Sequence, residues 1–235
     1  MKNFLFTLLF CVQFSFSQNT DHLNTVLKQL KLKESQIRIE LFTEKILPYD
    51  KSKSILVIPK YASDIEEGSF VLDAYLLLID NATGKIISKF IEPNAWTSDA
   101  VILTDVTIDT GLYHLNKTTR AFGVRADYRT QSQPNPYNET NLSLYVVEKN
   151  TLKPVLHNYT IYRYRGEWDM KCNGEFEDND STIDIDKLQT NNFNNLIVKT
   201  KITKTKNTYK NDDCVSKETI KKETSKLIFN GKEYK

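Results

Sequence analysis

The sequence predicts a mainly β protein, built as a meander of antiparallel hairpins with sandwich-like or partial propeller-like sheets and a short N-terminal helix. Two observations carry this prediction. Short apolar runs rich in Ile, Leu, Val and Tyr recur between polar turns along most of the chain. Apolar residues at helical spacing occur in one segment, close to the N-terminus.

Residues 1–17 have the pattern of a signal peptide. A basic start precedes the apolar run 4–12, which is shorter than the roughly 20 residues that a membrane-spanning helix needs. Small residues at a cleavage site follow and end at Ser17, so we expect cleavage before Gln18. No later run approaches spanning length. The pattern therefore predicts an extracytoplasmic protein, periplasmic or secreted, with residues 18–235 as a single β-rich domain.

The helix is expected over residues 21–35. Asp21 can accept hydrogen bonds at its start, and the apolar stripe consists of Leu23, Val26, Leu27 and Leu30. Four apolar residues make a narrow stripe, so we expect this helix to pack on a sheet.

Strands are expected over most of the remaining chain. Two long hairpins are predicted, at 74–90 around Asn-Ala-Thr-Gly and at 142–164. Further strands are predicted at 54–61, 101–108, 121–128, 181–188, 195–205 and 225–234, the last with an Asn-Gly turn. The two hairpin turns echo each other and a tryptophan follows each, as in propeller blades, but two units cannot close a propeller. A twisted antiparallel sheet or a two-sheet sandwich is the expected arrangement.

Two cysteines, Cys172 and Cys214, remain once the signal peptide is removed. An even number of cysteines in an oxidising compartment predicts a disulfide, here tying the segment 166–180 to the C-terminal region. Two thiols do not supply the four ligands of a structural zinc site, and their separation is unlike that of a redox C-x-x-C pair.

The stretch "GEWDMKCNGEFEDND", residues 166–180, opens an acidic region that we expect to be a solvated, disulfide-tied surface loop. A calcium loop is the alternative. An EF-hand counted from Asp178 needs Gly at the sixth position and Glu at the twelfth, where this chain has Ile183 and Gln189. The motif fails, and an irregular calcium site stays open; no other cofactor or metal is predicted.

No catalytic residue is assigned, because no nucleophile elbow, zinc-protease motif or phosphate-binding loop is present. Polar groups beside aromatic residues suggest a weak candidate ligand surface, made of Trp96, Asp99, Glu167, Trp168, Asp169 and Glu175. The alternative for Trp96 is a buried core residue. Paired carboxylates within 167–177 also raise the possibility of glycoside hydrolysis, with Trp168 stacking on a sugar.

The formal net charge is +2, and basic residues gather at the C-terminal end, where residues 199–235 contain eleven Lys and five acids. Lysines on an edge strand block sheet-to-sheet aggregation, so this pattern does not by itself indicate nucleic-acid binding. We expect no nucleic-acid partner and no transmembrane segment after signal removal, and the sequence names no other partner.

Several blocks resemble an uncharacterised family of exported bacterial proteins. They are "LDAYLLLIDNATGK", "WTSDAV", "RAFGVRADY", "NPYNETNLSLYVVE", "KPVL" and the G-E-W-D-x-x-C-x-G-E-F block, and they span roughly residues 70–180. The resemblance implies a secreted, β-rich protein and implies no activity. With the absence of catalytic motifs, it leads us to expect a non-catalytic envelope-associated or binding protein. The alternative is a hydrolase acting on envelope glycan or peptide through the carboxylates around 167–177.

Overall fold

The computed structural model describes residues 17–62 and 68–235, and it confirms the predicted mainly β class with one short α-helix. The predicted signal peptide lies outside the described residues, except for Ser17. The helix is α1 (Ser17–Leu30), and two 3-10 turns follow at Glu34–Gln36 and Ile39–Leu41. The strands are β1 (Thr43–Leu47), β2 (Asp50–Tyr61), β3 (Phe70–Asp80), β4 (Ile86–Ser98), β5 (Val101–Asp109), β6 (Phe122–Thr130), β7 (Tyr137–Glu148), β8 (Thr151–Trp168), β9 (Gly174–Thr190), β10 (Phe193–Lys210) and β11 (Asp213–Leu227).

The bounds predicted for the helix, 21–35, were wrong at both ends. The helix begins at Ser17, so Asp21 lies inside it and is not its N-cap. It ends at Leu30 because Lys31 takes a left-handed conformation with a φ of 56°. The amides of Lys31 and Leu32 then bond back to the carbonyls of Lys28 and Leu27. These two bonds form a Schellman motif, which closes a helix whatever helical propensity follows.

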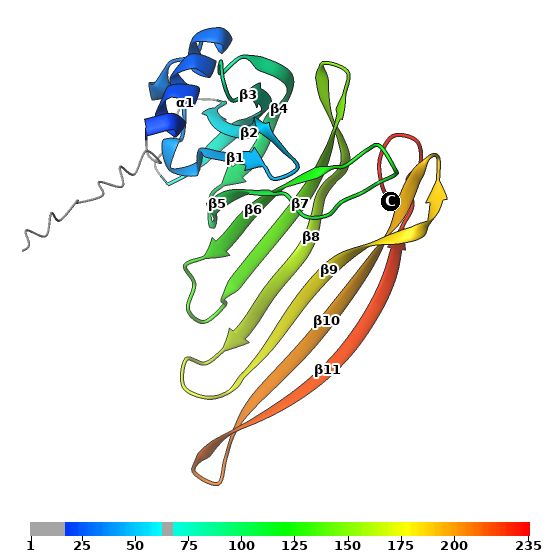
Figure 1. Cartoon of the computed structure of the whole chain (residues 1–235). Coiled ribbons are helices and arrows are strands. Elements are labelled where there is room, and N and C mark those ends of the chain that lie inside the picture. The colour runs from blue at the N-terminus through cyan, green and yellow to red at the C-terminus, as the bar shows by residue number, and fades with distance from the viewer. Residues whose placement is uncertain (1–16, 63–67) are drawn as a thin grey trace, which may run out of the picture.

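All eleven strands of the described residues belong to one sheet. The main path runs β1-β2-β3-β4-β8-β7-β6-β5, and β9, β10 and β11 continue from the later part of the β8 edge whose start meets β4. Every pairing is antiparallel except that of β4 with β8, which meet in parallel at Lys89 and Thr151. The sheet curls until its first and last strands approach, where the Lys45 ammonium donates to the Ile108 carbonyl at 3.0 Å. The strands β1–β8 thus form a nearly closed body, from which β9–β11 extend as a long curved arm (Figure 1).

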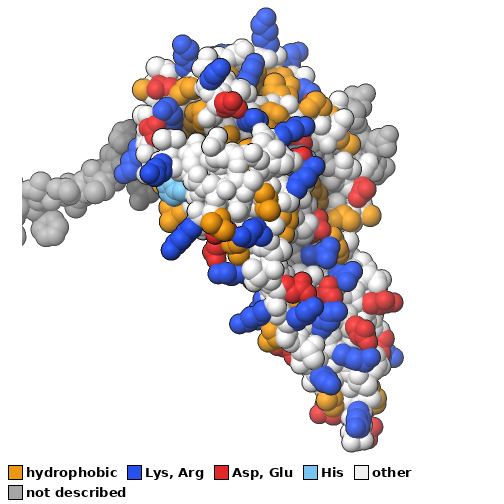
Figure 2. All heavy atoms as spheres, turned by 90° about the vertical axis from the view of Figure 1, so that its right-hand side faces the viewer, with side chains coloured by type: hydrophobic (Ala, Val, Ile, Leu, Met, Phe, Trp, Pro, Cys, Tyr) orange, Lys and Arg blue, Asp and Glu red, His pale blue; other side chains and the backbone are white. Residues whose placement is uncertain are grey.

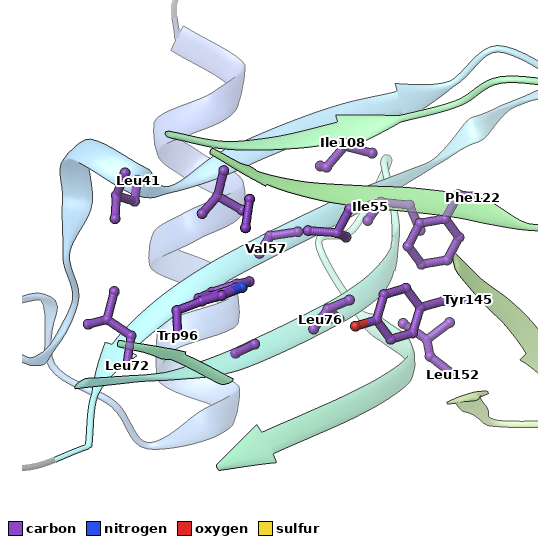
Figure 3. Packing of buried hydrophobic residues seen from close by; sticks show 14 of the residues in the cluster. Leu41, Ile55, Val57, Leu72, Leu76, Trp96, Ile108, Phe122, Tyr145 and Leu152 are labelled. Atoms are coloured by element: carbon purple, nitrogen blue, oxygen red, sulfur yellow. The ribbon is translucent and has the colours of Figure 1, made fainter. Parts of the chain in front are cut away.

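The two strands with uninterrupted apolar runs, β2 and β3, are buried on both faces. The inward side chains join the inner core, which includes Ile55, Val57, Leu76 and Trp96 (Figure 3). The outward side chains of the same strands pack under α1, in a cluster that includes Val26, Leu27, Leu56, Ile58, Leu77 and Ile79. A strand covered from both sides has no solvated face, which is why the alternation of polar and apolar residues is lost here.

A second layer covers the outer face of β7 and β8 and gives this end of the molecule a sandwich-like arrangement. Leu142 and Leu144 of β7 share a core with Leu196 of β10, and with Phe229 and Tyr234 of the C-terminal segment. The predicted Asn230-Gly231 turn is present, with Gly231 at a φ of 96°. Only a single bridge, Phe229 to Tyr234, flanks it, and the long strand before it is β11, which the sequence analysis missed.

A charged cluster on the outer face locks β5 to β6. The Arg125 guanidinium donates two hydrogen bonds to Asp109 Oδ2, at 2.9 and 2.6 Å, and the Tyr113 hydroxyl donates to the same oxygen at 2.8 Å. Burial raises the pKa of Asp109, but the hydrogen bonds from Arg125 and Tyr113 outweigh it and hold this pKa below its usual value. The cluster therefore favours the ionised carboxylate.

Asp109→Asn should lower the free energy of unfolding by about 1–2 kcal/mol, because charge-assisted hydrogen bonds are lost. The value is reduced because the Arg125 side chain is 40% exposed, so solvent screens the pair. Since the folded-state pKa is lowered, the stabilisation is complete above the usual pKa of 3.8 and is lost as the pH falls below it. Urea unfolding between pH 2 and 7 measures both effects.

The matched control is Asp184→Asn. Asp184 contacts Lys199 at 2.6 Å, but both side chains are more than half exposed, so a change within about 0.5 kcal/mol is expected. Equal destabilisation by the two substitutions would contradict the assignment of the partly buried Asp109 as a residue that joins β5 to β6.

Candidate ligand-binding surface

The stretch 166–180 is not the loop that the sequence analysis predicted. Strand β8 ends at Trp168, residues 169–173 form a tight turn, and β9 begins at Gly174. Four of its acids, Glu175, Glu177, Asp178 and Asp180, are therefore held in fixed positions on β9, which lies between β8 and β10, two on each face. The prediction failed because the first part of β9 is hydrophilic and lacks the apolar alternation that identifies a strand.

Glycines and aromatic rings pair across β8 and β9 on one face of the arm. Gly166 is opposite Phe176, and a Cβ added at Gly166 would lie 2.3 Å from the Phe176 ring. Gly174 is opposite Trp168. A Cβ added at Gly174 would lie 2.3 Å from the Cβ of Trp168. The ring of Phe176 also contacts those of Tyr164 and Trp168. The conspicuous residues of this block thus have a packing role.

The turn between β8 and β9 is organised by Asp169. Its Oδ1 accepts from the amides of Lys171 and Cys172, and its Oδ2 accepts from the Asn173 side chain at 2.8 Å. The bond from Asn173, followed by those from the two amides, lowers the pKa of Asp169. Both oxygens of the Asp169 carboxylate therefore accept hydrogen bonds from within the turn.

The predicted pair Cys172–Cys214 is at disulfide distance, with the two Cα atoms 5.7 Å apart. Cys172 is buried, and Cys214 is the second residue of β11. The bridge joins the β8–β9 turn to the tip of the β10–β11 hairpin, where Asn173 also accepts from the Tyr209 amide at 2.9 Å. The segment 166–180 is tied to the C-terminal region, as predicted.

The opposite face of the arm carries a ladder of charges. Glu177 forms two ion pairs, with Arg165 of β8 at 3.1 Å and with Lys204 of β10 at 3.2 Å. Glu175 contacts Lys206 at 2.6 Å, and this hydrogen bond lowers the pKa of Glu175. We name this surface the ladder groove, a hollow of about 640 Å³ lined by Arg165, Gly166, Glu167, Glu175, Phe176, Glu177, Lys204, Thr205, Lys206, Lys217 and Thr219.

A second hollow, of about 560 Å³, adjoins the ladder groove and shares Arg165 and Gly166 with it. We name it the mouth pocket, because residues from the β4–β5 junction and from β6, β7 and β8 meet there at one end of the curled body. Its lining consists of Thr97, Asp99, Val101, Tyr128, Thr130, Asn135, Pro136, Tyr137, Glu139, Asn141, Arg165 and Gly166. Two tyrosine rings and several polar side chains converge on it, a combination of aromatic and polar groups found in small-molecule sites.

Glu139 is the organising acceptor of the mouth pocket. The Tyr137 hydroxyl donates to its Oε2 at 2.6 Å, and the Asn141 amide donates to its Oε1 at 2.7 Å. Burial and the neighbouring Glu139 raise the pKa of Tyr128 to about 12, and burial with the bond to Glu139 raises that of Tyr137 to about 12. Both phenols therefore stay neutral at physiological pH and present ring faces with hydroxyl groups. The remaining lone pairs of the Glu139 carboxylate are available to a ligand.

The predicted surface residues separate into different environments. Trp96 is 6% exposed and belongs to the inner core, so its assignment to a ligand surface was wrong and the core alternative is right. Asp99 lines the mouth pocket, where its Oδ1 also accepts from the Val101 amide at 2.9 Å. Glu167 and Glu175 are opposite each other in the ladder groove. Trp168 donates from Nε1 to the Gln133 carbonyl at 2.6 Å and, like Asp169, supports the turn.

Sequence analysis missed the residues that build the mouth pocket, namely Tyr128, Tyr137, Glu139, Asn141 and Arg165. Alternation along β7 is the signal that could have found three of them. The residues at 137, 139 and 141 share a face, and that face continues into the core at Tyr145. A polar triplet that extends a buried face marks a partly buried polar site.

Within residues 17–62 and 68–235, no three His, Cys, Asp or Glu side chains gather in a way that would hold a metal ion. The acids of "DNDSTIDID" are Asp178, Asp180, Asp184 and Asp186, which occupy alternate positions of β9 and are spread along the extended strand instead of gathering at one point. Over the same residues, no helix has the length and apolarity to cross a membrane. Comparison of the chain with protein-family models, with curated proteins and with solved structures found no match.

Gly166→Ala should lower the free energy of unfolding by about 1–3 kcal/mol, because the new methyl group overlaps the Phe176 ring. Glu167→Ala is the matched control, since the adjacent side chain is exposed on the other face and should matter by less than about 0.5 kcal/mol. Thermal unfolding of both variants decides the point. Unchanged stability in Gly166→Ala would show that the ring does not cover this glycine.

Replacing both Cys172 and Cys214 by Ser should lower the free energy of unfolding by up to about 4 kcal/mol, from the entropy of a loop of this length in the unfolded chain. Urea unfolding of the wild-type protein with reductant should reproduce the loss. If reductant leaves the wild-type protein unaffected while mass spectrometry detects free thiols, the bridge does not contribute to stability.

Proposed function

We propose that the chain is a non-catalytic exported binding protein whose ligand occupies the mouth pocket. The observation that carries this proposal is the convergence of two neutral tyrosines, the Glu139 carboxylate and the Arg165 guanidinium on one hollow of about 560 Å³. This volume is within the roughly 300–1,000 Å³ of small-molecule sites.

The chemistry of the lining favours a sugar ring of an envelope glycan. A sugar presents an apolar C–H face, which packs on aromatic rings such as those of Tyr128 and Tyr137. Its hydroxyl groups donate to carboxylates and accept from guanidinium and amide groups. Glu139, Arg165 and Asn141 offer these groups around the two rings.

Export is part of the same proposal. It is supported by the signal-peptide pattern of residues 1–17 and by the Cys172–Cys214 pair at bonding distance, because structural disulfides persist in oxidising compartments.

The alternative is a hydrolase that uses Glu167 and Glu175. One observation favours it, since the two residues are opposite each other on neighbouring strands and share a face. Against it, a general acid for glycoside cleavage needs a raised pKa, whereas Lys206 lowers that of Glu175. The side chain of Glu175 is also 71% exposed, so no cleft shields it from water. Binding without turnover is therefore the function that we propose.

A panel of soluble envelope-glycan fragments, titrated by calorimetry and then analysed for cleavage, tests both ideas. We expect saturable binding without new products. Glu139→Gln and Arg165→Gln should each weaken binding about tenfold or more, since each removes a charged hydrogen-bonding group.

Arg129→Gln is the matched control, because Arg129 lies on β6 beside Tyr128 but points to the opposite face. Binding that withstands both pocket substitutions would place the ligand elsewhere. Cleavage of a fragment, abolished by Glu167→Gln, would establish the hydrolase instead.

A further inference from the structure

The last strand of the arm, β11, has one edge that pairs with no other described strand. Within the described residues it pairs with β10 alone, and every residue from Asp213 to Lys226 is exposed. Two of its apolar side chains, Val215 and Ile220, are 49% and 54% exposed. A long edge strand presents a row of unpaired amides and carbonyls that another strand can bond. The view from the side of β11 shows acidic and basic side chains interspersed over the tapering arm (Figure 2).

The charges along β11 are self-complementary in one antiparallel register. If two copies align with Ile220 opposite Ile220, Lys217 is opposite Glu223 and Glu218 is opposite Lys222. A two-fold axis through the sheet repeats each of these pairs. Residues opposite each other are then on the same face, as an antiparallel pair requires. Opposite charges at such cross-strand positions stabilise pairing.

Neighbouring registers place like charges opposite each other. Centring the pair on Glu218, Lys221 or Lys222 would set that residue against its own copy. Centring it on Thr219 would set Lys217 against Lys221. Like charges directly opposite each other destabilise a strand pair, so these registers are disfavoured. The charges of β11 thus disfavour these other registers and favour the alignment about Ile220. Repulsion in the wrong alignments is one way in which edge charges confer specificity.

We propose that β11 is a homodimer interface, at which two copies of the chain pair antiparallel about Ile220 and continue the sheet from one arm into the other. The occupant is a second copy, because the charge pattern of β11 is complementary to itself. Because the two-fold axis is perpendicular to the joined sheet, the ladder grooves of both copies lie on the same face of that sheet. This inference is independent of the ligand proposed for the mouth pocket.

Sedimentation equilibrium of the purified, disulfide-intact protein, from about 1 to 200 μM, measures the association. We expect a monomer–dimer equilibrium in the wild-type protein. Glu218→Lys and Lys222→Glu should each weaken association about tenfold, because each turns two symmetric attractions into repulsions. The double swap E218K/K222E should restore it. Neither side chain has an ion pair within the described part of its own chain, so the folded monomer is expected to tolerate both changes.

Lys187→Glu is the control for net charge, as this exposed lysine lies near the β9–β10 turn, away from the Ile220 centre of the proposed interface. I220K should abolish association, since it places two ammonium groups together on the axis. Far-UV circular dichroism verifies that each variant is folded.

A second readout does not depend on weakened association. I220C should form a covalent dimer with a short thiol cross-linker, whereas V215C, which would face Ser225 of the other copy, should not. A wild-type protein that stays monomeric throughout would overturn the proposal. So would a dimer that is insensitive to I220K, or a double swap that fails to restore association, since either would place the interface on another surface or with a foreign strand.

Discussion

The structure depends on the backbone hydrogen bonding of β8, which changes partner along one edge while it keeps β7 along the other. Near Thr151 this changing edge meets β4, which joins strands β1–β4 to strands β5–β8 in one sheet. From Tyr162 to Trp168 the same edge bonds β9 and starts the arm. The strand bends between these parts, where Asn158 takes a φ of 46° and the register with β7 shifts. Such irregularities redirect a strand without interrupting its sheet.

The bend of β8 determines where the polar hollows form. The body and the arm diverge beside the end of β8, so Arg165 lines both the mouth pocket and the ladder groove. Its guanidinium is held by Glu177 of β9, while the residue opposite it on β7 is Tyr137. A change at Arg165 would therefore affect both hollows. The candidate site is a consequence of the partner change, because neither β7 nor β9 alone supplies its lining.

The two faces of the arm are held together by different interactions. One face holds glycines against aromatic rings, which packs a thin sheet that has no second layer there. The other face pairs acids of β9 with lysines of β10, so that the charges of two hydrophilic strands offset one another. Exposed pairs of this kind add little stability each, and the disulfide at the tip provides a stronger constraint. The arm can then extend into solvent with a free polar edge.

Local chemistry in the sequence determined several features by itself. Apolar runs with turn residues established the mainly β class and the hairpins β3–β4 and β7–β8, and the two cysteines of the predicted mature chain indicated their own pairing. The helix was recognisable from its stripe, but its end depends on the conformation of Lys31, which residue type does not dictate.

Only the tertiary structure decided the rest. Strand segments that are hydrophilic on both faces, such as most of β11 and the first part of β9, give no periodic apolar signal, because they are held by neighbouring strands and not by a buried face. The mouth pocket joins residues far apart in the chain, from Asp99 to Arg165, and no local pattern records that proximity. Trp96 shows the same limit, because its place in the core follows from the curl of the sheet, which is a property of all the strands together.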